Sequence, residues 1–168
     1  MLTLLVKLLK VLNSEQSPNQ IAAAISLAAI IGITPLLSLH NLLVVFAVLF
    51  LRVNLTLFLV SWPIFALLGV ALSPLSESLG RAVLQAESLI PLWQTFYNTL
   101  LGRWSNFYYA GVFGSLLIGV ITGLILYPVS SRLIVAYRHR WLEKLERFKI
   151  VKLLKTSRLW QMYQSYSG

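Results

Sequence analysis

The chain has 168 residues, of which 58% are hydrophobic and 11% are charged. In typical soluble domains about half of the residues are hydrophobic and about a quarter are charged. The formal net charge is +9, and the absence of Cys excludes disulfides and thiolate metal sites. The apolar surplus is concentrated in long runs, which predicts an all-α integral membrane bundle rather than a soluble domain with a large core.

The first element, residues 1–16, consists mostly of Leu and Val up to residue 12, where Lys7 and Lys10 share one side of a predicted helix. This pattern is typical of an interfacial helix that lies on a membrane. A short helix packed on the rest of the protein explains the pattern equally well. A secretory signal is not indicated, because positive charge does not precede the apolar run.

Residues 17–51 form the longest apolar run, and Thr34-Pro35 interrupts it once. Ser17 and Pro18 suit a helix start, and Gly32 suits a helix end. Each arm, 18–33 and 36–51, has sixteen residues. That is roughly 24 Å, which falls short of a hydrocarbon core of about 30 Å. We therefore expect a broken-helix hairpin, either a re-entrant loop or two short spans.

Polar side chains gather around this break. We expect Thr34 to cap the second arm, so that free backbone amides and a positive helix end face the membrane interior. Broken helices of this kind hold anionic groups in transporters. The alternative is that these side chains only bond neighbouring helices. The predicted ligand-binding set is Thr34, Pro35, Ser38, His40, Asn41, Arg52 and Asn54.

Three further segments complete the predicted membrane domain, 17–131. Residues 54–72 and 108–131 are predicted as full spans, the latter ended by Tyr127-Pro128. Residues 73–107 are predicted to lie outside as two amphipathic surface helices, the second of which follows Pro91 and is rich in aromatic residues. The alternative for these aromatic side chains is that they pack on the bundle.

Small residues four positions apart mark two predicted helix-contact faces, one in the first arm and one in the last span. Such faces serve folding within one chain, oligomerisation or a partner, and we expect the first. The residues are Ala24, Ala28, Gly32, Gly111, Ser115, Gly119 and Gly123.

The C-terminal segment, 132–168, is a basic amphipathic tail. Residues 132–158 hold nine Lys/Arg and two Glu, a net charge of +7. We expect it on the anionic cytoplasmic membrane surface, with both termini cytoplasmic. Nucleic acid is not the expected partner, because the charge lies beside a span. The predicted surface residues are Arg138, Arg140, Lys144, Arg147, Lys149, Lys152 and Lys155.

Several short elements, in order, resemble the bacterial DUF2062 family of small membrane proteins. They are Ser17-Pro18, Ile21-Ala22, Gly32 with Pro35, and Arg52-Val53-Asn54. Trp62-Pro63 departs from the Asn-Pro expected in the family, and Leu36 stands where glycine is common. The resemblance implies an inner-membrane protein of unestablished activity and supplies no catalytic residues.

The sequence indicates no enzyme, metal or cofactor. His40 and His139 lie far apart along the chain, and no Ser/His/acid arrangement or phosphate-binding loop is present. The expected function is to bind or help move an anionic amphiphile, such as a phospholipid or a lipid-linked phosphate, at the polar hairpin. The alternative is a non-catalytic subunit or assembly factor that holds a membrane-protein partner, or a second copy, through the small-residue stripe and the basic tail.

Overall fold

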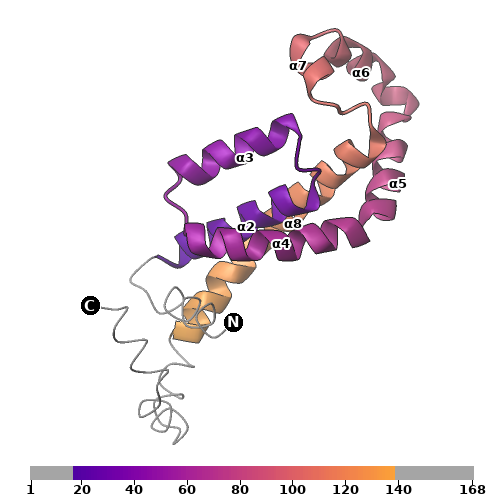
Figure 1. Ribbon diagram of the computed structural model, residues 1–168. Coiled ribbons are helices and arrows are strands. Elements are labelled where there is room, and N and C mark those ends of the chain that lie inside the picture. The colour runs from indigo at the N-terminus through magenta and orange to yellow at the C-terminus, as the bar shows by residue number, and fades with distance from the viewer. Residues whose placement is uncertain (1–16, 139–168) are drawn as a thin grey trace, which may run out of the picture.

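The computed structural model describes residues 17–138, and Figure 1 shows the arrangement of the helices. Within this range every regular element is a helix and there is no strand, which confirms the all-α class. The predicted N-terminal helix at 1–16 lies outside the described residues. So does the basic tail from residue 139 onward, including Arg140, Lys144, Arg147, Lys149, Lys152 and Lys155.

The predicted break in the first apolar run is confirmed. Helix α2 (Pro18–Ile33) has the bounds that the sequence predicts. It starts in a capping box, in which Ser17 Oγ accepts from the Gln20 amide at 3.3 Å and the Ser17 amide donates to Gln20 Oε1 at 3.3 Å. Helix α3 (Leu39–Phe50) begins three residues later than expected, because residues 34–38 form the turn.

Two helices separated by a bend follow the hairpin. Helix α4 (Leu55–Ala71) starts at Asn54, whose side-chain oxygen accepts from the Leu57 amide at 2.8 Å. Helix α5 (Ser73–Leu84) continues from it with a bend of 67°. Pro74 explains the bend, because it offers no N–H and its ring collides with the preceding turn of a straight helix.

The rest of the predicted surface segment is more broken than expected. It forms a 3₁₀ turn η1 (Glu87–Leu89), α6 (Ile90–Tyr97) and α7 (Leu100–Trp104). The prediction of one helix after Pro91 was wrong, because Thr99 starts a new helix by accepting from the Gly102 amide at 3.0 Å.

Aromatic side chains hold this segment against the start of the last helix. Trp93 lies edge-on to Phe113 with ring centroids 5.0 Å apart, and Phe107 lies 5.6 Å from the same ring. Trp93 therefore packs on the bundle, which is the alternative that the sequence left open for these aromatic side chains.

Helix α8 (Ala110–Ala136) passes through Pro128, so the predicted end at Tyr127-Pro128 was wrong. Packing compensates for the one backbone bond that Pro128 removes. Ser131 Oγ donates to Asn19 Oδ1 at 3.0 Å, and Ile134 is buried in the same core cluster as Ile21. The last turns of α8 are thus fastened to the start of α2.

Helix α2 is central in the bundle, as Figure 1 shows: it packs along both α4 and α8, while α5 packs on α8. Helix α3 runs back toward the start of α2 but contacts it only sparsely. The core cluster consists of Ile21, Ala24, Ala28, Ile31, Val48, Val53, Leu57, Phe58 and Ile134.

By length and composition, α8 is the one helix of residues 17–138 that could cross a membrane by itself. The bent pair α4–α5 becomes a second candidate if it counts as one path. Helix α4 has 17 residues, roughly 26 Å, so it does not by itself confirm the full span predicted at 54–72.

Candidate functional site

The hairpin turn is held by hydrogen bonds that the side chains of Thr34 and Asn41 make with each other and with nearby backbone carbonyls. Thr34 Oγ1 lies 2.8 Å from Asn41 Oδ1 and 2.9 Å from the Ile30 carbonyl. Asn41 Nδ2 donates to the carbonyl of Pro35 at 2.8 Å. Both side chains are buried. The polar groups of this turn therefore satisfy one another and fix the angle at which the chain doubles back.

Thr34 does not cap the second arm, so that prediction was wrong. It is the C-terminal cap of α2, and its backbone N–H and hydroxyl both reach back to Ile30. The N-cap of α3 is Ser38, whose hydroxyl donates instead to the Pro35 carbonyl at 2.7 Å. Pro35 has no N–H to donate to the preceding turn, so the helix ends at this point and the following residues form the hairpin turn.

His40 lies at the same turn but faces another part of the fold. Its Nε2 is 3.0 Å from Ser38 Oγ, and its ring lies 6.0 Å from that of Phe107. Its Nδ1 is buried without a hydrogen-bond partner among the described residues. His40 therefore joins the turn to the aromatic segment.

Arg52 and Asn54 belong to the opposite end of α3, so the structure does not bring them to the turn. Helix α3 has 12 residues, which separates its two ends by roughly 18 Å. Asn54 caps α4, and Arg52 has a positive φ of 49° in the short α3–α4 connection. Arg52 was expected to assist Thr34 only if the fold brought it close, and the fold does not do so.

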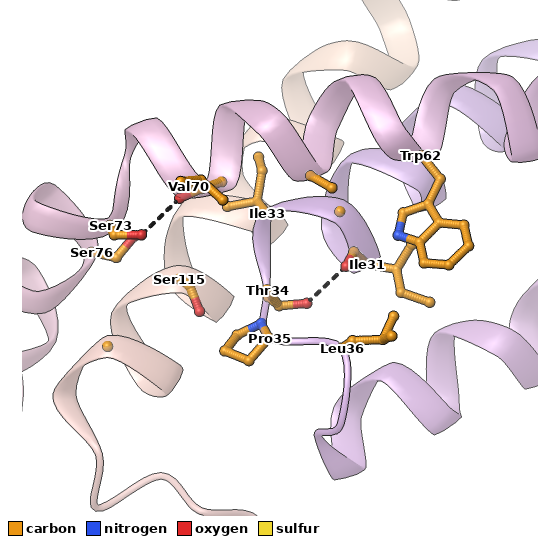
Figure 2. A pocket seen from close by; sticks show the side chains of 14 residues that line it. Ile31, Ile33, Thr34, Pro35, Leu36, Trp62, Val70, Ser73, Ser76 and Ser115 are labelled. Atoms are coloured by element: carbon orange, nitrogen blue, oxygen red, sulfur yellow. Dashed lines mark hydrogen bonds between the residues drawn. The ribbon is translucent and has the colours of Figure 1, made fainter.

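A cavity of about 400 Å³ lies beside the turn, between the end of α2, the bend of α4 and α5, and the start of α8. Figure 2 shows Thr34 and Pro35 on one side of it and Ser73, Ser76 and Ser115 on another. The lining residues are Ile31, Gly32, Ile33, Thr34, Pro35, Leu36, Trp62, Ala66, Gly69, Val70, Ser73, Ser76, Gly111 and Ser115.

The polar lining of this cavity consists of hydroxyl groups and backbone, without a charged side chain. Ser73 Oγ donates to the Gly69 carbonyl at 3.1 Å, and Ser115 Oγ donates to the Val112 carbonyl at 2.9 Å. Ser76 is only 2% exposed, and its hydroxyl has no hydrogen-bond partner among residues 17–138. A buried polar group without a partner is costly, which makes Ser76 a candidate contact for a water molecule or a ligand.

Two helix N-termini meet at the cavity. The first residue of α5, Ser73, and the second residue of α8, Gly111, line it, and no side chain caps either helix. The amides of Ser76, Val112 and Phe113 already bond the carbonyls of Leu72 and Tyr109, and Pro74 has no N–H, so the outermost amides, such as that of Gly111, remain for an anion. The positive end of each helix dipole favours an anion at the same place. A Cβ at Gly111 would meet nothing within 4 Å, so the start of α8 is open on this side.

The small residues predicted as contact faces lie mostly inside the bundle. Gly32 packs on α4, where a Cβ would come within 2.6 Å of Phe65 Cβ. Gly119 and Gly123 pack on α2 around Ile30. Ala24 and Ala28 are buried in α2, and Ser115 lines the cavity, as does Gly111.

The tightest helix contact was not singled out from the sequence. Gly80 of α5 and Gly114 of α8 face each other, and a Cβ at either would lie under 2 Å from a backbone carbonyl oxygen of the other helix. These two glycines, with Ser76 four residues before Gly80, form a small-xxx-small pattern that a search for such spacing could have found. Ser73 and Ser76 were also missed as site residues, because no polar pattern in the sequence connects them with Thr34 or with the start of α8.

No group of three or more His, Cys, Asp or Glu that could hold a metal ion is found in the described part of the chain. Of the predicted membrane-surface cations, only Arg138 lies within it, in the turn that follows α8.

The geometry of residues 17–138 defines a class: a small helical protein with a doubled-back apolar hairpin and a mostly apolar, uncharged cavity at a helix bend, with a few hydroxyl groups in its lining. Residues 3–142 match the family described as "Uncharacterized protein conserved in bacteria (DUF2062)". The chain belongs to that family, as the resemblance of its first apolar run implies.

A relative from Treponema pallidum (strain Nichols), described as "Uncharacterized protein", is 26% identical over 159 residues. The alignment covers 95% of this chain and 98% of the relative. No solved structure matches.

Proposed function

We propose that this protein is a multi-pass inner-membrane protein that binds, and helps to move, an anionic amphiphile by holding its phosphate-bearing head in the cavity beside the hairpin turn. The observation that carries the proposal is the junction of two uncapped helix N-termini with the unpartnered Ser76 hydroxyl on one cavity. Free amides and a free hydroxyl are the groups that a phosphate oxygen accepts from in the absence of Arg or Lys.

The membrane setting is supported by the outward face of α3. Leu43, Leu49 and Phe50 are 67%, 65% and 79% exposed. A run of large apolar side chains with this exposure is costly in water and is satisfied by lipid. With α8 long enough to cross, a bilayer is the surrounding that both helices favour.

The same-side topology is supported by the contact between the two ends of the described chain. Asn19, near the start of α2, and Ser131, near the end of α8, are hydrogen-bonded. The two ends of this range therefore lie on one side of the bundle, as the charges of both termini predict for a cytoplasmic location. In this arrangement the hairpin turn lies toward the other side.

In this proposal only some of the polar residues of the hairpin contact the ligand, and the others fix the shape of the cavity. Thr34 and Pro35 line the cavity, whereas Asn41 holds the turn from behind. The partner-holding alternative is less favoured at the small-residue stripe, because Gly119 and Gly123 are packed against α2; the basic tail, on which it also rests, lies outside the described residues.

The test fills the cavity without disturbing the bundle. A Gly111→Leu variant of the full chain places its side chain in open space at the cavity wall, so we expect it to fold. Phospholipid retained by the detergent-purified protein, counted by native mass spectrometry, should fall by about tenfold or more, the change that corresponds to about 1.4 kcal/mol.

The matched control is Ser78→Leu, which adds the same side chain at an exposed position of α5 outside the cavity. It should retain lipid like the wild-type chain. A folded Gly111→Leu protein that keeps its full lipid complement, or equal losses in both variants, would refute the cavity as the binding site.

A further inference from the structure

One wall of the cavity is the C-terminal end of α2, which contributes Ile31, Gly32 and Ile33 to the lining. The last carbonyl groups of a helix lack intrahelical partners. Ile30 and Ile31 find a partner in Thr34, but the carbonyl oxygens of Gly32 and Ile33 receive no hydrogen bond from the described residues. In a continued helix the amides of Leu36 and Leu37 would donate to these two carbonyls, but both residues lie in the turn instead.

These two oxygens face α4 at Gly69. Each lies 2.9 Å from the point where a Cβ of residue 69 would stand. Any side chain at this position would cover them, whereas glycine leaves only its Cα hydrogens against them. Gly32, Ile33 and Gly69 are all lining residues of the cavity, so this contact lies at its edge.

Three hydroxyl groups of the cavity lining present acceptors as well. The Ser73 and Ser115 protons are used on backbone carbonyls, and that of Thr34 is used on Ile30 and Asn41. A hydroxyl whose proton is engaged still offers oxygen lone pairs. The negative end of the α2 dipole points to the same place.

We propose that this wall binds a primary ammonium group, so that the amphiphile is zwitterionic, with an aminoalkyl phosphate head. The inference rests on the proposed function, which assigns the phosphate to the N-termini of α5 and α8. The ammonium donates to the Gly32 and Ile33 carbonyls and to Ser73 Oγ, while the phosphate takes the Ser76 hydroxyl and the free amides. Unwound carbonyls at half-helix ends hold cations in this way in transporters.

The occupant is a head group rather than a bare metal cation, because the cavity is too large for an ion alone. Its volume of about 400 Å³ falls in the range of sites for organic ligands. The lining also has no carboxylate to neutralise a tightly held metal ion, whereas a zwitterion carries its own counter-charge.

The experiment measures three phospholipids with identical acyl chains on the full-length protein in detergent, by native mass spectrometry titration. Phosphatidylethanolamine should bind at least about tenfold more tightly than phosphatidylglycerol, which lacks the ammonium. Phosphatidylcholine should resemble phosphatidylglycerol, because its quaternary ammonium has no proton to donate.

A variant separates the two charges of the ligand. Ser73→Ala removes one acceptor at an exposed residue without a packing change. It should lower phosphatidylethanolamine binding several-fold and leave phosphatidylglycerol binding unchanged, and Ser73→Thr should restore the preference. A merely structural role of Ser73 would shift both lipids alike.

The outcomes separate the two proposals. Equal binding of the three lipids, all lost in Gly111→Leu, overturns the ammonium site and leaves the proposed function standing. Absence of any lipid binding overturns both. Release of phosphatidylethanolamine by millimolar NaCl but not by choline chloride would show that a bare Na⁺ ion occupies the wall, which also overturns the inference.

Discussion

The two arms of the hairpin, α2 and α3, have nearly the same apolar character but opposite surroundings. Nine of the sixteen residues of α2 are buried, against three of the twelve residues of α3. Helix α2 contains small residues at its contact faces, which allow α4 and α8 to approach its backbone. Helix α3 has large side chains on nearly all sides and remains at the periphery. Side-chain size, not hydrophobicity, decides which arm becomes the centre.

The largest effect is expected from giving α2 a larger contact residue. Gly32→Ala places a methyl group within 3 Å of three atoms of α4, two of them in the backbone, so the two helices must separate. We expect a loss of about 3 kcal/mol, the upper part of the usual overpacking range, seen as a lower midpoint of thermal unfolding in detergent.

The control is Gly111→Ala, whose methyl group meets nothing within 4 Å. It should match or exceed wild-type stability, because Ala favours a helix over Gly by about 1 kcal/mol. Similar destabilisation by both changes would show that the α2–α4 contact does not depend on the small residue.

The next effect tests the outward face of α3. Leu43→Lys and Leu49→Lys each place a charge on a largely exposed side chain. If this face meets lipid, each change costs about 2.5–3.5 kcal/mol of insertion near the bilayer centre. The fraction of protein recovered in membranes should fall.

Ser78→Lys, at an exposed position of α5, provides the matched charge. It should leave membrane recovery nearly unchanged. Normal recovery of both α3 variants, with stability in detergent also unchanged, would argue that α3 faces water.

A smaller effect is expected at the turn that joins the two arms. Asn41→Ala removes two side-chain hydrogen bonds of a buried residue, one with the Thr34 hydroxyl and one to the Pro35 carbonyl, although both groups keep a partner in Ile30 and Ser38. We expect a loss of about 1–3 kcal/mol in thermal unfolding. Ser38→Ala, which removes an exposed bond to the same carbonyl, should cost less than Asn41→Ala; the reverse order would contradict the role given to Asn41.

The smallest effect is expected far from both arms. Glu77 and Arg81 form an ion pair one turn apart on α5, with both side chains more than half exposed. Glu77→Gln should change stability by only a few tenths of a kcal/mol, because exposed helix pairs contribute little. A loss as large as that of Asn41→Ala would place this pair in a less exposed setting than the fold gives it.

The sequence by itself determined the local elements. Ser17 and Pro18 start α2, Thr34-Pro35 ends it, and Asn54 starts α4, since these side chains act on backbone groups a few residues away. The break of the first apolar run could be predicted for the same reason. So could the family to which the chain belongs, because its short elements follow in order along the chain.

Only the tertiary structure decided where α8 ends, which residues meet at the cavity and how far Arg52 lies from the hairpin turn. Helix α8 runs through Pro128 because its last turns bind α2, a contact more than a hundred residues away along the chain. Ser76 and Gly111 come to one cavity only because Gly80 and Gly114 bring α5 against α8. Arg52 is kept from the Thr34 end by the length of α3. Packing between distant segments selects among helix ends and partners that local patterns leave open, because the close approach of two backbones depends on both helices at once.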